Sequence, residues 1–246
     1  MLLQHRRHRR PVDEAEKPFW ISFSDLMTAL MVLFLVAMAV ALLGMTQSLR
    51  KLDDARKGRQ QAIQTCLADL QAITQQPQFA GVRLRGQTLE FGPLAEFGKG
   101  DNSLSPERAR FVRAFVPQVL ALARTPGCQA WLKRFVVEGY ASPEGSYLYN
   151  LNLSLERSQR FLCVLLDTAS PDALRREDRQ AVRELFLVGG SSFNSPVLNQ
   201  PEKSRRVELR LEFQESAASC ANGGCAAERK TIPWDDDVKC PLGGAR

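Results

Sequence analysis

The stretch WISFSDLMTALMVLFLVAMAVALL, residues 20–43, organises the rest of the chain, because it is nearly continuous apolar sequence. The hydrocarbon core of a bilayer is about 30 Å thick and needs about 20 such residues in a helix. The apolar region of a secretory signal peptide, the alternative interpretation, is usually only about 7–15 residues long. This run is longer, and the charged sequence after Gly44 continues the helical pattern. We therefore predict a retained transmembrane helix over residues 20–44 and a helical linker over residues 45–80.

Asp25 is the single ionisable residue of this stretch. An ionised carboxylate is costly to place in hydrocarbon, so such residues usually face a bundle interior or a water-filled cavity. The alternative is that Asp25 lies at the start of the helix, where it reaches the lipid headgroups or, like Ser24, caps the first turn. Trp20 favours the membrane interface, which would place Asp25 more than one helical turn inside. We therefore favour a functional role for Asp25.

The basic cluster HRRHRR, residues 5–10, precedes the predicted span. Positively charged flanks stay in the cytoplasm, so this cluster predicts that residues 1–19 are cytoplasmic and that the part after the helix is outside. A less dense set of basic residues follows the helix and favours the opposite orientation: Arg50, Lys51, Arg56, Lys57 and Arg59. Because the N-terminal cluster is denser, we predict a single-pass protein with its N-terminus inside.

The chain has 246 residues, a formal net charge of +6 and a pI of about 9.2. The basic excess is spread along the chain and partly held in the N-terminal cluster. That distribution is typical of a membrane-surface protein rather than of a nucleic-acid groove, so we expect no nucleic-acid binding. The part after the predicted span is long enough for one domain plus connecting segments.

All six cysteines follow the predicted span: Cys66, Cys128, Cys163, Cys220, Cys225 and Cys240. This placement favours disulfides in an oxidising exterior, with their pairing left open. The competing interpretation is a metal site, since Cys220 and Cys225 form a C-x4-C pair. Both histidines lie at the N-terminus and no C-x2-C pair is present, so we expect no metal site. The last of these cysteines fall in residues 216–246, a stretch without periodicity that we expect to be extended or disordered unless disulfides pin it.

Alternation of apolar and polar residues predicts the strands of a domain over residues 81–215. The stretch VRLRGQTLEFG alternates around Gly86 and predicts a strand or hairpin with its bend at that glycine. RFVVEGY, residues 134–140, is typical of a short buried strand. RRVELRLEFQ, residues 205–214, alternates most clearly.

Helical spacing predicts three helices between these strands. Ser105 is the candidate cap of the first, with Pro106 in its first turn and Pro117 as a candidate kink inside it. The second begins at about Ser146, and a third, polar helix over residues 172–184 leads into LFLVGG. This order of elements predicts an α+β fold, in which a small mixed sheet carries helices on one face.

The stretch EGYASPEGSYLYNLNLSLERSQRF, residues 138–161, and the later KSRRVELRLEF resemble the OmpA-like peptidoglycan-binding domain. The resemblance implies that this domain binds peptidoglycan through the residues that match the family motif: Ser142, Tyr149, Asn150, Leu153 and Arg157. In that family an aspartate, two residues after a histidine, holds the diaminopimelate of the peptide stem together with the helix arginine. Here Tyr140 and Ser142 stand at the histidine and aspartate positions. The resemblance therefore implies that Arg157 pairs with a ligand carboxylate, in an altered form of the family's recognition.

The segment FSDLMTALM, residues 23–31, resembles the membrane helix of flagellar motor stator B subunits, the MotB family. In that family the aspartate of the motif carries the translocated ion, and it matches Asp25, with Ser24 and Thr28 as supporting residues of the ion path. The wording FWISFSDLMTALM is also similar to the ZorB family of the Zorya anti-phage defence system. Members of that family form an ion-driven motor with a multi-helix membrane partner, ZorA.

These resemblances imply that the chain is the B-type subunit of an ion-driven rotary motor in a bacterial inner membrane, anchored to peptidoglycan by a periplasmic domain. They imply a homodimer inside a ring of ZorA- or MotA-type subunits, five by the family pattern. For the ion we expect a proton rather than sodium, for which Ser22, Ser24 and Thr28 would offer additional oxygens. We expect no cofactor.

Two alternatives remain open. A passive tether between inner membrane and cell wall explains the architecture but not Asp25, and a neighbouring gene for a polytopic membrane protein would favour the motor. A stator-like unit of a different motor system is the other. We do not expect an enzyme, because the exterior part has no histidine for a catalytic triad and no phosphate-binding glycine loop.

Overall fold

The computed structural model describes residues 17–215 and 239–242. The chain divides into two compact units, residues 1–57 and 58–246. Helix α1 (Lys17–Thr74) is a single run of 58 residues that contains the predicted span and most of the predicted linker. The predicted span, residues 20–44, and the predicted linker, residues 45–80, therefore form one continuous helix up to Thr74.

In the first unit, α1 carries apolar side chains around its whole circumference. It is the one helix in the described part of the chain that is long and apolar enough to cross a membrane, by length and composition. Side chains such as Leu30, Leu33 and Phe34 are more than three-fifths exposed. An apolar surface of this kind must be covered by lipid or by other membrane helices. In the second unit, α1 ends at Thr74, before the predicted boundary of the linker at residue 80, because Pro77 cannot continue the helix.

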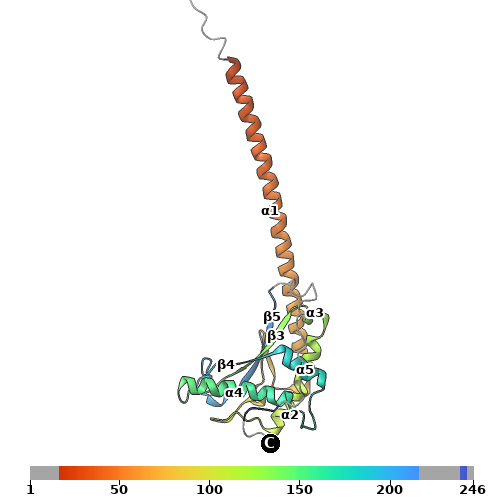
Figure 1. Cartoon of the computed structure of the whole chain (residues 1–246), viewed down its shortest axis with the longest axis vertical. Coiled ribbons are helices and arrows are strands. Elements are labelled where there is room, and N and C mark those ends of the chain that lie inside the picture. Colours follow the sequence, from red (N-terminus) through yellow and green to blue (C-terminus); the bar gives the residue numbers. More distant parts are fainter. Residues whose placement is uncertain (1–16, 216–238, 243–246) are drawn as a thin grey trace, which may run out of the picture. The chain divides into compact units, whose positions relative to one another are not determined.

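The second unit is built on a five-stranded mixed sheet with the strand order β1-β2-β5-β3-β4. Figure 1 labels strands β3, β4 and β5 of this sheet. Its strands are β1 (Arg83–Arg85), β2 (Thr88–Glu90), β3 (Leu132–Gly139), β4 (Phe186–Gly190) and β5 (Val207–Phe213). Strands β3 and β4 are parallel, and the other neighbours are antiparallel. Gly86 lies at the bend between β1 and β2 with a φ of 60°, so the predicted hairpin is confirmed.

Three longer helices accompany the sheet: α2 (Pro106–Ala123), α4 (Tyr147–Leu166) and α5 (Arg176–Leu185). Four short elements complete the unit: η1 (Pro77–Phe79), η2 (Gly92–Ala95), α3 (Pro126–Gln129) and α6 (Pro201–Ser204). The predicted cap Ser105 is confirmed, and Ser146 caps α4 at the predicted start of the second helix. The Oγ atoms of Ser105 and Ser146 accept hydrogen bonds from the backbone N–H groups of Arg108 and Tyr149.

Helix α2 contains Pro117, as predicted, and helix α5 differs from the prediction in its start. Helix α2 runs through Pro117, which removes one backbone hydrogen bond but does not end the helix. Helix α5 begins at Arg176, later than the predicted Asp172. Asp172 instead accepts a hydrogen bond from Ser170 and pairs with Arg113 at 2.9 Å, so its side chain stabilises a turn ahead of the helix.

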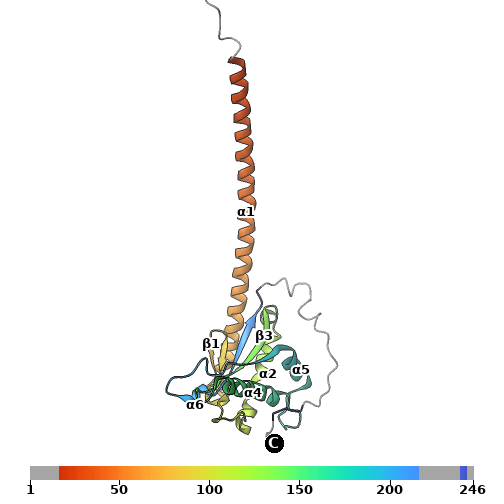
Figure 2. The ribbon, with the colours of Figure 1, turned by 60° about the vertical axis from the view of Figure 1, so that its left-hand side comes forward.

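The helices pack on one face of the sheet, as predicted (Figure 2). Val207, Leu209 and Leu211 of β5 are buried in the core, and the charged residues between them face the opposite side. Phe115 of α2 and Phe161 of α4 belong to the same core. The sheet therefore has an apolar inner face and a charged outer face.

Two disulfides tie distant segments of the second unit together. One joins the end of α1 to α3, and the other joins α4 to the segment 239–242: Cys66–Cys128 and Cys163–Cys240. The prediction of disulfides is confirmed for these four cysteines. The basic cluster at residues 5–10 and most of the predicted tail, with Cys220 and Cys225, lie outside the described residues.

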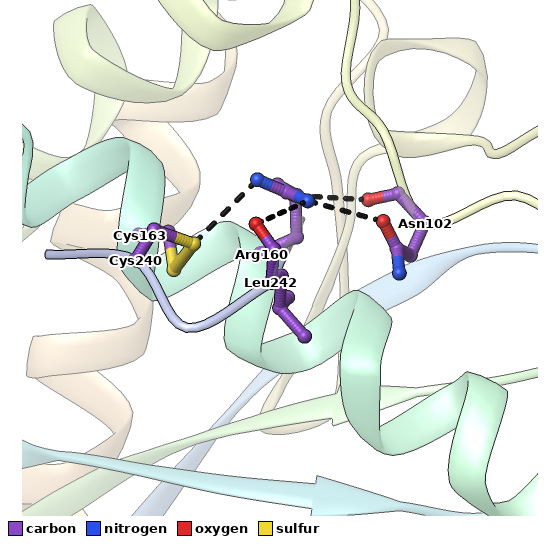
Figure 3. Close-up of a disulfide and its surroundings, with 5 residues drawn as sticks. All are labelled: Asn102, Arg160, Cys163, Cys240 and Leu242. Carbon is purple, nitrogen blue, oxygen red and sulfur yellow. Dashed lines mark hydrogen bonds between the residues drawn. A yellow bond between two sulfur atoms is a disulfide. The ribbon is translucent and has the colours of Figure 1, made fainter. Parts of the chain in front are cut away.

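Arg160 lies beside the second disulfide (Figure 3). Its guanidinium donates to Cys240 Sγ at 3.5 Å and to the Leu242 carbonyl at 3.4 Å. It also donates to the backbone carbonyl and the side-chain oxygen of Asn102, at 3.3 and 3.2 Å. A buried arginine and a covalent bond therefore hold the described end of the chain against α4.

Candidate functional site

Three segments meet at the N-terminus of α4: the loop 98–103, the turn 140–146 and the first turns of the helix. The five predicted wall-binding residues lie here: Ser142, Tyr149, Asn150, Leu153 and Arg157. Asn150, Leu153 and Arg157 follow one another at helical spacing on one face of α4, and all three are buried. Tyr149 is 55% exposed, so it is the predicted residue that solvent reaches most easily.

Two of the predicted residues stabilise the turn before α4. The Asn150 amide donates to the carbonyl oxygens of Glu144 at 2.9 Å and Ser146 at 3.2 Å. The Ser142 hydroxyl donates to the Glu144 carboxylate at 3.0 Å. Both side chains are more than nine-tenths buried. Ser142 and Asn150 therefore fix the shape of the turn, and Glu144 carries the exposed charge.

Arg157 is completely buried beneath this surface. Its guanidinium donates to the carbonyl oxygens of Asp101 at 3.0 Å, Tyr140 at 2.8 Å and Gly98 at 2.9 Å, and lies 5.3 Å from the centre of the Phe97 ring. Burial lowers the pKa of Arg157 to about 10, which leaves it charged at neutral pH. Arg157 thus joins the loop 98–103 to the end of β3. A bidentate pair with a ligand carboxylate would require some of these bonds to open.

The close approach of α4 to the sheet depends on two glycines. A Cβ atom at Gly139 would lie 1.9 Å from the Ser154 carbonyl oxygen, and one at Gly190 would lie 2.7 Å from Ser154 Oγ. The same hydroxyl accepts a hydrogen bond from Ser192 N–H and donates to the Leu151 carbonyl. Helix α4 is therefore locked against the ends of β3 and β4, which places its N-terminus at the candidate site.

The exposed part of the site contains residues that the sequence did not single out. Lys99 and Glu144 face each other across it, with 3.8 Å between Nζ and Oε2. The Tyr147 ring packs edge-on against Phe193, with 5.6 Å between ring centres. The signal for Lys99 was its place in the glycine-bounded loop GKGDNS, directly ahead of the first predicted helix. Its ion pair with Glu144 is a tertiary contact, so the local sequence does not predict it.

The second candidate site lies in the first unit, on α1. Asp25 and Thr28 are three residues apart, so they share a face of the helix, and Ser24 adjoins them. Thr28 Oγ1 donates to the backbone carbonyls of Ser24 at 3.0 Å and Asp25 at 2.9 Å. The three predicted ion-path residues therefore form one polar turn of an otherwise apolar helix. A single helix does not enclose a path by itself.

Comparisons with known proteins match both units. The sequence family described as "Membrane MotB of proton-channel complex MotA/MotB" matches residues 4–47. The Zorya protein ZorB of Escherichia coli O139:H28 (strain E24377A / ETEC) is 40% identical over 208 residues, which cover 83% of this chain and 84% of that protein.

Solved structures similar to the chain include the periplasmic domain of Helicobacter pylori MotB (residues 78–256 of that protein). It has 12% identity and a TM-score of 0.39, and covers 61% of this chain and 91% of its own. The OmpA-like domain of FopA1 from Francisella tularensis has 16% identity and a TM-score of 0.36, and covers 54% and 81%.

Proposed function

The chain belongs to the ZorB family, and from this premise we propose that it is the B-type subunit of an ion-driven motor, anchored to peptidoglycan and acting in anti-phage defence. The observation that carries the proposal is the 40% identity to a ZorB protein over 83% of the chain. The match of residues 4–47 to the MotB membrane segment supports it independently, because that segment includes Asp25.

In this proposal Asp25 carries the translocated ion. An ionisable residue within an apolar span is expensive to keep and usually serves a transport path. Each elementary charge that crosses the membrane field releases about 2.3 kcal/mol per 100 mV, which supplies the work of a motor step. We favour a proton as the ion, because a lone carboxylate can bind and release one without a coordination shell. Sodium is the alternative, with the Ser24 and Thr28 hydroxyls as added ligands.

The exposed apolar surface of α1 supports a membrane partner. Two copies of the chain would bring two Asp25 carboxylates together, and a ring of ZorA- or MotA-type subunits, five by the family pattern, would cover the remaining apolar side chains. Helices that bury polar residues in a membrane pack against one another in this way.

The disulfides support the proposed orientation. Both lie in the second unit, and disulfides persist in oxidising compartments such as the periplasm. The basic cluster at residues 5–10 would then stay in the cytoplasm, in agreement with the positive-inside rule. We therefore propose an inner-membrane protein with a cytoplasmic N-terminus and a periplasmic C-terminal unit.

The N-terminus of α4 is the proposed contact with the cell wall. Exposed Tyr149 offers a flat apolar surface, and Lys99 and Glu144 offer one charge of each sign. Ser142, Asn150, Leu153 and Arg157 hold these groups in place from beneath. Arg157 acts in this proposal as a positioning residue, whose bonds to three carbonyls shape the surface that the peptide stem meets.

The substitution Asp25→Asn tests the motor proposal. The amide is nearly isosteric and cheaper to bury than a charge, so the variant should insert and assemble with its membrane partner. Protection against phage should be lost, because an amide does not exchange protons in the accessible pH range. Plaque counts measure protection, and copurification with the partner measures assembly.

Asp54→Asn is the matched control, since it makes the same change on α1 beyond the apolar stretch and should leave protection intact. Full protection by an assembled Asp25→Asn variant would contradict ion carriage. It would favour the passive tether, for which no charge at this position is needed.

A further inference from the structure

A cavity of about 520 Å³ lies on the outer face of the sheet, at its β1 edge. Its walls are the outer-face side chains of β1, β2 and the start of β5. Element η2 and the segment from Val197 to Lys203 border it. Phe91, which is 1% exposed, and Pro93 contribute apolar surface to its lining. No helix of the inner face takes part in this cavity.

The cavity is lined by charges of both signs. Four are cationic, from Arg83, Arg85, Lys203 and Arg206. Three are carboxylates, from Glu90, Glu96 and Glu208.

Some of these charges are matched within the protein. Arg206 pairs with Glu208 at 2.6 Å, and Arg85 pairs with Glu90 at 3.3 Å. Within the described residues, no ion pair involves the other three side chains, two cations and one carboxylate: Arg83, Lys203 and Glu96. They remain available to a ligand.

This set of groups selects among ligand classes. A neutral sugar would hydrogen-bond to these side chains but would leave their charges unpaired. A polyanion such as a phosphate-rich polymer would pair with the cations but would place its own charges beside the three carboxylates. A short peptide that carries carboxylates and a free ammonium group matches both signs, and its aliphatic part can pack against Pro93.

We propose that this cavity is a second wall-peptide subsite, which binds the zwitterionic end of a peptidoglycan stem peptide. Arg83 and Lys203 pair with its carboxylates, and Glu96 pairs with its ammonium group. The proposal rests on the proposed function of the second unit as a wall anchor. It adds a site formed by residues that lie outside the family motif.

The cavity is connected to the α4 site through side-chain contacts. The Arg206 guanidinium lies 4.3 Å from the centre of the Tyr140 ring, and the Tyr140 carbonyl accepts the hydrogen bond from Arg157. On the other side, Glu96 in the cavity is followed by Phe97, over whose ring Arg157 lies. Two neighbouring subsites on one unit strengthen attachment to a polymer that repeats the same peptide, because the second contact is intramolecular.

The experiment uses the full chain in detergent, with two probes. One is purified sacculi, and the other is the soluble tetrapeptide released from sacculi by an amidase. The double variant Arg83→Ala/Lys203→Ala should bind the tetrapeptide about 10-fold more weakly, the sum of two modest ion pairs. Glu96→Gln should weaken binding of the free peptide but not of the same peptide with its amino groups acetylated. All three positions are at least partly exposed, and thermal unfolding checks that the variants fold.

The matched control is Arg110→Ala/Lys133→Ala, which removes the same charge from exposed positions outside the cavity and should change nothing. Suppose that the unchanged chain binds sacculi and that the Arg83→Ala/Lys203→Ala variant binds the tetrapeptide as tightly as the unchanged chain does. The proposal of a second subsite is then wrong, while the proposal of a wall anchor is retained. If the unchanged chain does not bind sacculi, the anchor itself is wrong. If the double variant instead loses only binding to phosphatidylglycerol vesicles, the cavity recognises a lipid headgroup and the peptide assignment is overturned.

Discussion

Asp25 and Arg157 are both ionisable residues, but their surroundings differ between the two units. In the first unit, Asp25 sits on a helix whose apolar side chains are exposed, and the described chain offers it no partner from another segment. In the second unit, Arg157 is fully enclosed and donates to three carbonyls of its own unit. Arg157 is therefore paired within its own unit, whereas Asp25 is not paired with another segment within the described part of the first unit. Function in the first unit should depend on what surrounds it, and function in the second on internal packing.

The largest expected effect on stability is in the second unit, at Gly139. Alanine there would place a Cβ atom 1.9 Å from the Ser154 carbonyl oxygen, so α4 must move away from the sheet. We expect Gly139→Ala to lower the free energy of unfolding by about 3 kcal/mol. Denaturant unfolding of the full chain measures this loss, and the helical signal from α1 should persist through the transition.

Gly127→Ala is the matched control, because a Cβ atom there meets nothing within 4 Å. An unfolding midpoint of Gly139→Ala equal to that of the unchanged chain would mean that α4 is not locked to the sheet, and the contrast between the units would weaken.

The elements that the sequence predicted well are those that local chemistry determines. The caps Ser105 and Ser146, the bend at Gly86 and the alternation of β5 each follow from a few neighbouring residues. The start of α5 was predicted too early, because Asp172 is drawn into a turn by Arg113, which lies far away in the sequence.

The candidate site also combines features that local sequence determines with features that depend on tertiary contacts. The residues that match the family motif lie together at the N-terminus of α4, and their role in wall binding stays a prediction. It could not show that Arg157 faces inward, because its three carbonyl partners come from two other segments. The cavity beside β1 went unpredicted for the same reason, since its charges come from segments of the chain that meet only in the folded unit.

The next effect in size concerns Arg157. Lysine has a single ammonium group and cannot reproduce the planar fork that reaches Asp101, Tyr140 and Gly98 together. We expect Arg157→Lys to leave buried carbonyls without a donor and to lower the free energy of unfolding by about 2 kcal/mol. Arg110→Lys on the exposed side of α2 is the control and should be neutral.

Sacculus binding distinguishes two possible roles of Arg157, that of a positioning residue and that of a direct contact with the ligand. If it is a positioning residue, binding by Arg157→Lys should weaken in step with stability and recover when the variant is assayed at lower temperature. Weakened binding with no loss of stability would instead make Arg157 a direct ligand contact. In that case both units would contain a charged side chain that acts on a partner outside the unit.

The smallest expected effect is the response of the second unit to acid. Hydrogen bonds from Arg134 hold the pKa of Glu212 below its ordinary value, and hydrogen bonds from Arg113 and Ser170 do the same for Asp172. A carboxyl whose pKa is lowered by folding stabilises the folded state above its unfolded pKa, and this stabilisation is lost as the pH falls through the folded value. Stability should therefore decline from about pH 4 downward.

The size of this decline is limited by solvent. The Glu212 and Asp172 side chains are about one-third exposed, at 30% and 35%, so each pair contributes less than about 1 kcal/mol after screening. Thermal unfolding between pH 6 and pH 3 measures the decline in stability. The Glu212→Gln variant should lose less stability over this range than the unchanged chain. Glu215→Gln, at an exposed position after β5, is the control and should show the same decline as the unchanged chain. A decline of several kcal/mol that survives Glu212→Gln would place the acid-sensitive group elsewhere. The second unit would then depend on a titrating charge as strongly as the first is proposed to depend on Asp25.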